Sequence, residues 1–149
     1  MNDTVRVLVA AAILSLAAIA LLAWRIARAD PTEAERLIGQ LRLAQWAAVL
    51  LAGVSAVPIG LAVSRVAELT SNFDAAFGVV LLGLAGIVLQ REPREALLVV
   101  AVGFVLHALL DIAHRPGWLS VELAPRWFTV GCATHNVCLA AICYWARRR

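Results

Sequence analysis

The sequence contains no lysine and few charged residues of any kind. All 13 basic residues are arginine, and charged residues occupy 15% of the 149 positions against 62% for hydrophobic ones. A soluble domain of this length cannot bury so much apolar surface, so a water-soluble globular fold is excluded. Polar stretches long enough for a second domain are also lacking. We therefore expect a single integral membrane domain over residues 1–149, and the all-arginine composition is typical of a GC-rich bacterial genome.

Cysteine is scarce as well. Cys132, Cys138 and Cys143 all lie in the last apolar segment, and an odd number without a loop position argues against a disulfide framework. Buried free thiols acting as small hydrophobic side chains explain them. The net charge of +3 comes largely from Arg147–Arg149, which anchor a spanning helix at the cytoplasmic face. The basic tail therefore does not indicate a nucleic-acid partner.

What the sequence has in abundance is long apolar runs. A helix needs roughly 20 apolar residues to cross a bilayer, and five segments approach that length. We predict an all-α bundle of five transmembrane helices, of which the third is the shortest. The predicted spans are Val5–Trp24, Leu43–Ser64, Asp74–Gln90, Ala96–His114 and Trp127–Ala146.

The distribution of arginine predicts the orientation of the bundle. The two sides of the membrane would carry four and nine arginines. The poorer side, with the N-terminus, has Arg6, Arg65, Arg115 and Arg126, and the richer side has Arg25, Arg28, Arg36, Arg42, Arg91, Arg94 and Arg147–Arg149. Because cytoplasmic loops are enriched in positive charge, the N-terminus should lie outside and the C-terminus in the cytoplasm. We expect a multi-pass protein of the bacterial inner (plasma) membrane.

Prolines mark the connections and one span. Asp30 is a candidate N-cap and Pro31 a first helical residue, so a helix should begin there and run into the second span. Pro93 permits a sharp reversal before the fourth span. Pro58 lies inside the second span, where it should bend the helix and free a backbone carbonyl near Val54.

The stretch HALLDIAH, residues 107–114, interrupts the fourth apolar run with three polar side chains. Offsets of four and three place His107, Asp111 and His114 on one stripe of a helix. An ionisable group near the bilayer centre costs about 2.5–3.5 kcal/mol even on insertion scales. The stripe should therefore face the interior of the bundle.

The antiparallel fifth span offers a partner for this stripe at a similar depth. His135 lies in its outer half, together with Cys132 and Asn136, and Asp74 at the start of the third span could join from another side. Imidazole and carboxylate groups together are ligands for Zn²⁺ and non-haem iron. We predict a periplasm-facing metal pocket formed by His107, Asp111, His114, His135 and Asp74.

If the protein is an enzyme, the pocket fits a metal-dependent hydrolase or oxidoreductase acting on a lipid-like substrate. His107 and His135 would be ligands, Asp111 a ligand or an orienting group, and His114 a ligand or a general acid–base residue. Asp111 and His114 are thus the catalytic candidates. Membrane lipid is the expected partner.

Several other interpretations stay open. His107 or His114 could bind a b-type haem together with His135. The deep histidines could also form only an interhelical hydrogen bond. The chain could be a non-catalytic subunit of a larger membrane complex or a homo-oligomer. A through-going ion path is disfavoured, because the polar residues gather at one end of the bundle.

The segments HALLDIAH and CATHN carry a resemblance. The last 45 residues or so resemble small bacterial polytopic membrane proteins with an H-x3-D-x2-H motif and a polar cysteine-containing cluster in the next helix, a resemblance that implies no activity. This set of histidine and aspartate residues is also similar to the one found in membrane zinc hydrolases of the alkaline ceramidase and progestin-receptor type. That likeness implies His107, His114 and His135 with Asp74 or Asp111 as the ligand set. Five spans instead of seven, and no paired H-x3-H in the last helix, depart from that pattern.

Overall fold

The computed structural model describes residues 3–28, 32–64, 69–114 and 125–149, and within these ranges the chain is helical with short turns. The helices are α1 (Asp3–Arg28), α2 (Glu33–Ser64), α3 (Leu69–Val88), α4 (Pro93–Ala113) and α5 (Arg126–Arg147). The all-α prediction is confirmed. The predicted Asp30, Pro31, Arg65 and Arg115 lie outside the described residues.

Four helices are long and apolar enough to cross a membrane. They are α1, α4, α5 and the part of α2 from Ala34 to Gly60. In α3 the apolar stretch runs only from Phe73 to Val88, which is shorter than a full span. The chain is thus a multi-pass membrane protein by the length and composition of its helices. In α3, the part whose side chains the structure describes is shorter than a full crossing.

The helix starts follow capping rules, with one difference from the sequence prediction. At the start of α2 the Thr32 hydroxyl accepts a hydrogen bond from the backbone N–H of Glu35 at 3.4 Å. Thr32 therefore caps this helix, two residues after the predicted Asp30. The predicted continuity is confirmed, because α2 is one unbroken helix of 32 residues that continues through Pro58 to its end at Ser64. Pro93 occupies the first turn of α4 as expected.

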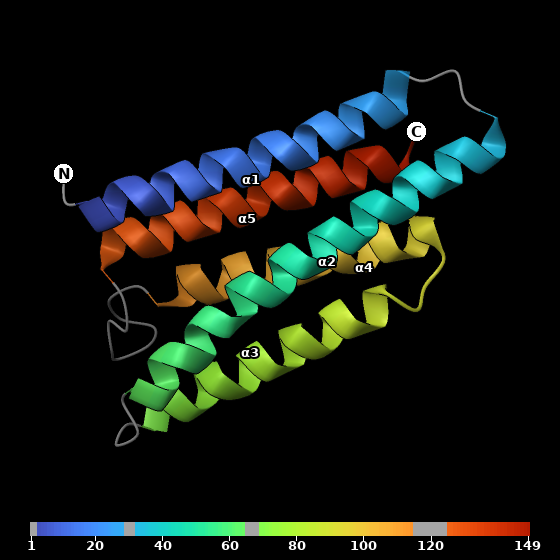
Figure 1. Cartoon of the computed structure of the whole chain (residues 1–149). Coiled ribbons are helices and arrows are strands. Elements are labelled where there is room, and N and C mark those ends of the chain that lie inside the picture. Colours follow the sequence, from blue (N-terminus) through green and yellow to red (C-terminus); the bar gives the residue numbers. More distant parts are fainter. Residues whose placement is uncertain (1–2, 29–31, 65–68, 115–124) are drawn as a thin grey trace.

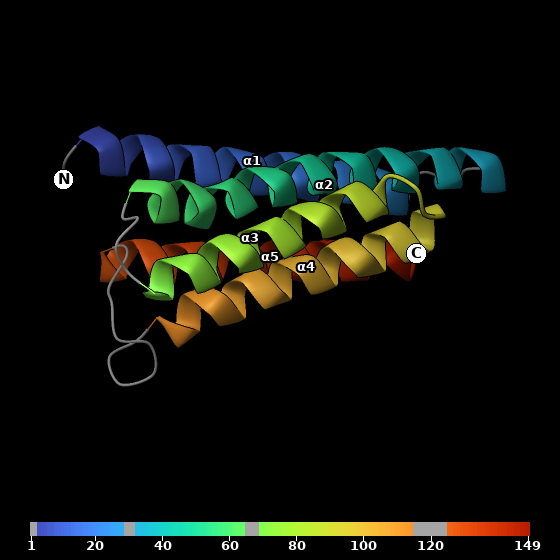
Figure 2. The ribbon, with the colours of Figure 1, turned by 90° about the horizontal axis from the view of Figure 1, so that it is seen from below.

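The helices run alternately up and down, and their ends gather at two faces of the bundle. The N-terminal ends of α1, α3 and α5 lie with the C-terminal ends of α2 and α4, as Figure 1 shows. The view in Figure 2 shows the same alternation from below. The most extensive helix contacts are between α4 and α5 and between α2 and α3, and α2 also packs on α4. Helix α1 rests on α5 and α2.

Two glycines let the helices approach closely at the centre of the bundle. A Cβ atom at Gly103 of α4 would lie 2.6 Å from a methyl carbon of Leu51 in α2. A Cβ atom at Gly78 of α3 would lie 2.9 Å from the Ser55 carbonyl oxygen, also in α2. A side chain at position 78 would meet the backbone of α2, so this position needs glycine, whereas at position 103 the buried Leu51 side chain would have to shift. The two glycines hold α3 and α4 against the part of α2 that contains Pro58.

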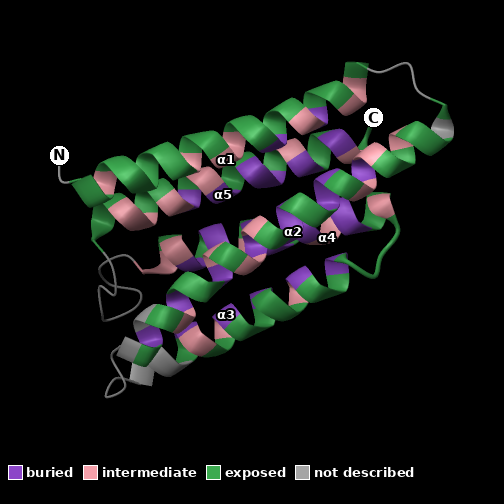
Figure 3. Ribbon diagram, viewed as in Figure 1, coloured by how far each residue is buried: buried purple, intermediate pink, exposed green. Residues whose placement is uncertain are grey.

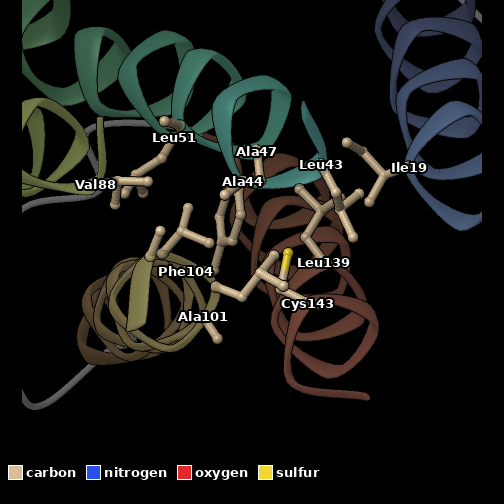
Figure 4. Packing of buried hydrophobic residues seen from close by; sticks show 14 of the residues in the cluster. Ile19, Leu43, Ala44, Ala47, Leu51, Val88, Ala101, Phe104, Leu139 and Cys143 are labelled. Atoms are coloured by element: carbon tan, nitrogen blue, oxygen red, sulfur yellow. The ribbon is translucent and has the colours of Figure 1, made fainter. Parts of the chain in front are cut away.

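The apolar core fills one half of the bundle. Phe104 and Leu139 pack with Leu43 and Leu51, and Cys143 lies among them with no solvent exposure (Figure 4). The core residues of α5 all follow Asn136 in the sequence. The outward faces carry many exposed Val, Leu and Ile side chains, and α1 is exposed along most of its length (Figure 3). Such faces suit a lipid environment.

Candidate metal site

A cavity lies beyond the apolar core, where α2 and α4 end and α3 and α5 begin. Its volume is about 40 Å³, enough for roughly three water molecules. We call it the metal pocket. Its lining residues are Val57, Pro58, Asp74, His107, Leu110, Asp111, His114, Phe128, Thr129 and Cys132. Four of the five residues predicted as metal ligands therefore line one cavity.

His107 is held in a single orientation by α2. Because Pro58 has no backbone N–H, the carbonyl of Val54 lacks its normal helical partner. The His107 Nε2–H donates to this Val54 oxygen at 3.0 Å. The side chain is 2% exposed, and the bond fixes the proton on Nε2. The predicted free carbonyl thus has a defined role: it orients a buried imidazole.

The other ring nitrogen of His107 faces a carboxylate and a thiol. Nδ1 lies 3.3 Å from Oδ2 of Asp111. The ligand atoms of His107, Asp111 and Cys132 all lie within 4.8 Å of one another. Tetrahedral zinc places its ligand atoms about 3.3–3.8 Å apart, so small side-chain movements would close this group around an ion. An imidazole lone pair and a carboxylate oxygen at 3.3 Å also require a proton or a metal ion between them.

Asn136 completes the inner wall of the group. Its side-chain nitrogen lies 3.1 Å from Nδ1 of His107 and 3.4 Å from the sulfur of Cys132. Its oxygen is buried and has no hydrogen-bond partner among the described residues. Cys132 and Asn136 are four residues apart, so both face α4 from one side of α5. Asn136 thereby fixes the spacing between the imidazole and the thiol.

His114 and Asp74 form a second pair in the same cavity. The His114 Nδ1–H donates to the carbonyl of Leu110 at 2.8 Å, and Nε2 lies 3.1 Å from Oδ2 of Asp74. Nε2 is also 3.0 Å from Oδ1 of Asp74, but only Oδ2 has hydrogen-bond geometry. Oδ1 is buried without a hydrogen-bond partner in the described part of the chain. The two side chains therefore share one hydrogen bond, through Oδ2, and Oδ1 lies in contact with His114 without a hydrogen bond of its own.

His135 lies elsewhere. Its Nε2–H donates to the hydroxyl oxygen of Ser15 in α1 at 2.9 Å, and Ser15 in turn donates to the carbonyl of Ala12. Successive residues of a helix point about 100° apart. Because Asn136 faces α4, His135 faces α1, which packs on the adjacent side of α5. The structure therefore does not bring His135 to His107, and the expected pairing of these two histidines is replaced by one between His107 and Asn136.

The structure adds one candidate ligand, Cys132, which the sequence pattern indicated only as a buried thiol near the pocket. Cys132 stands where His135 was expected, facing His107 and Asp111. The signal that could have found it is its spacing of four from Asn136, which puts the two polar groups of α5 on one face. Whether this face of α5 or the face with His135 meets α4 depends on how the neighbouring helices pack around α5.

Comparison of the chain with protein-family models, with curated proteins and with solved structures finds no match. The resemblance to membrane proteins with an H-x3-D-x2-H motif therefore stays a prediction.

Proposed function

We propose that the chain binds one transition-metal ion, Zn²⁺ in preference to harder ions, in the metal pocket. The observation that carries the proposal is the convergence of His107 Nδ1, the Asp111 carboxylate and the Cys132 sulfur within 4.8 Å. Nitrogen, oxygen and sulfur together suit Zn²⁺, whereas Mg²⁺ and Ca²⁺ prefer oxygen alone.

The surroundings of His107 support a metal ligand. Histidines that bind metal almost always donate their other ring N–H to a carbonyl or carboxylate. Here Nε2–H donates to Val54, and Nδ1 faces the Asp111 carboxylate at 3.3 Å and the Asn136 side-chain nitrogen at 3.1 Å.

Three protein ligands leave a fourth position open. Structural zinc sites have four protein ligands, whereas catalytic sites have three and an open position for water or substrate. The space in the pocket, about 40 Å³, lies beside these ligands. The site therefore fits metal-assisted chemistry, with the pair of Asp74 and His114 close by as a proton-transfer group.

A haem does not fit this geometry. The pocket is far smaller than a porphyrin, and His135, the expected second axial ligand, donates to Ser15 instead. A transmembrane ion path does not fit either. The apolar core of Phe104, Leu51 and Leu139 fills the bundle on the other side of His107. Ions could reach the pocket from one face only.

Charge supports an orientation with the pocket on the outer side. The pocket lies at the face where α1 begins, and the arginine-rich ends of the helices lie at the opposite face. Arg36 reaches the backbone of Arg149 there, at 3.2 Å. By the positive-inside rule the opposite face is cytoplasmic. In a bacterial inner membrane the pocket would open toward the periplasm.

The proposal is tested by the metal content and Zn²⁺ affinity of the full chain in detergent. Wild type should bind one Zn²⁺ per chain. His107→Ala and Asp111→Asn should each lower the affinity by at least 100-fold, because three ligands become two. His135→Ala is the matched control, since it removes a histidine of the same bundle outside the pocket. Absence of Zn²⁺ binding, or equal losses in all three variants, would overturn the proposal.

A further inference from the structure

One oxygen in the metal pocket, Oδ1 of Asp74, lies 3.0 Å from Nε2 of His114 but has no hydrogen-bond partner among the described residues. This oxygen is buried, although Oδ2 of the same carboxylate is bonded to His114. The Asp74 side chain is 1% exposed and lines the cavity. A buried acceptor without a hydrogen-bond partner is energetically unfavourable. The oxygen is therefore placed to accept a hydrogen bond from something that enters the pocket.

The shape of the pocket limits what that ligand could be. Its volume, about 40 Å³, admits an ion and a small polar group but no larger body. Around the polar groups, Val57, Leu110 and Phe128 contribute an apolar part of the lining. Val57 is 37% exposed on the outside of α2. An apolar tail attached to the polar group could thus continue from the pocket along the surface of the bundle.

The depth of the pocket points to the membrane interface. Val57 lies three residues before Gly60, the last residue of the candidate span in α2. His114 follows directly after the end of α4, and Cys132 lies six residues into α5. At 1.5 Å per residue these positions are within about 10 Å of the helix ends. Polar heads of membrane-dissolved molecules lie at that level.

We infer that the metal pocket binds a membrane-dissolved amphiphile whose polar head carries a metal-binding oxygen and an adjacent hydroxyl or N–H group. The head oxygen takes the open metal position, the hydroxyl or N–H donates to Oδ1 of Asp74, and the tail lies against Phe128 and Val57. The inference rests on the proposed function, because the head oxygen needs the metal ion.

Hydroxamic acids of two chain lengths are the probe, since they carry both a metal-binding oxygen and an N–H or O–H donor. The full chain is loaded with Co²⁺ in lipid nanodiscs, and the visible spectrum of the ion reports binding of acetohydroxamate and butyrohydroxamate. Wild type should bind butyrohydroxamate roughly 15-fold more tightly, at about fourfold per buried methylene. Phe128→Ala should reduce this difference without changing the affinity for acetohydroxamate.

Asp74 is tested with two variants. Asp74→Ala should weaken both hydroxamates by about 10- to 100-fold, while the Co²⁺ affinity stays within about threefold of wild type. Asp74→Asn keeps an acceptor oxygen and should recover most of the loss. If Co²⁺ binds and the hydroxamates leave its spectrum unchanged, or bind wild type and Asp74→Ala equally, the inference is overturned while the proposed function stands. If Co²⁺ itself does not bind, both are overturned.

Discussion

Pro58→Ala should make the metal-free protein more stable and the metal site weaker. Pro58 leaves the Val54 carbonyl without its helical donor, and His107 takes its place at 3.0 Å. Alanine at position 58 restores an N–H that bonds Val54 within α2. Because the Val54 oxygen then accepts from two donors, its bond to His107 weakens, while the buried Nε2–H keeps a partner. Stability rises while metal affinity falls, because Pro58 weakens α2 and by the same missing N–H leaves the Val54 carbonyl to His107.

The size of each effect follows from the structure. Proline inside a helix costs about 3 kcal/mol relative to alanine. Pro58 is buried, so its loss also removes two packed methylenes, about 1.6 kcal/mol. The metal-free variant should thus gain about 1–1.5 kcal/mol. The loss of the group that orients a metal-binding histidine typically lowers metal affinity by about 10- to 100-fold.

Three measurements check this prediction. Competition with a coloured chelator gives the Zn²⁺ affinity, and thermal unfolding of the chelator-treated protein gives the stability. Nitrogen NMR of the histidine side chains gives the tautomer, which should be the Nε2–H form for His107 in wild type and a mixture in the variant. Pro93→Ala is the control, because Pro93 stands in the first turn of α4 and blocks no hydrogen bond. Unchanged Zn²⁺ affinity in Pro58→Ala, or lower stability of its metal-free form, would refute the reasoning.

Three further predictions concern other parts of the bundle. Cys132→Ser should lower the Zn²⁺ affinity at least tenfold. It should also lower the number of protons released per Zn²⁺ bound at pH 7 from about two to about one, which calorimetry in buffers of different ionisation enthalpy measures. Ser15→Ala and His135→Ala should each lower the unfolding free energy by about 0.6 kcal/mol. The double variant should lose about the same amount, because all three variants lack the same hydrogen bond, and its Zn²⁺ affinity should be unchanged. Gly103→Ala should cost about 1–3 kcal/mol, seen as a lower unfolding temperature, because its methyl group would meet Leu51.

Hydropathy predicts most of the fold. Long apolar runs gave α1, α4 and α5 within a few residues, whereas α2 begins ten residues before the predicted span and α3 begins five residues before it. The predicted cap, Asp30, lies outside the described residues, and the described start of α2 is capped by Thr32, whose hydroxyl accepts from the N–H of Glu35. Hydropathy does not indicate which helices are neighbours in the bundle, so the close contacts at Gly78 and Gly103 could not be predicted.

The candidate site was predicted in part. The stripe of His107, Asp111 and His114 does turn inward and lines one cavity, because the cost of ionisable groups in lipid depends only on the helix that carries them. The partner in α5 was misjudged, because Cys132 and His135 face different neighbouring helices. Which face meets α4 depends on where α1 packs, and nothing local in the sequence encodes that.

The central claim, that His107, Asp111 and Cys132 hold a metal ion, is tested most directly by X-ray absorption at the zinc edge of the Zn²⁺-loaded protein. We expect one sulfur at about 2.3 Å and nitrogen or oxygen ligands at about 2.0–2.1 Å, with the sulfur shell lost in Cys132→Ser. A zinc environment of nitrogen and oxygen alone in wild type, or a sulfur shell that persists in Cys132→Ser, would contradict it.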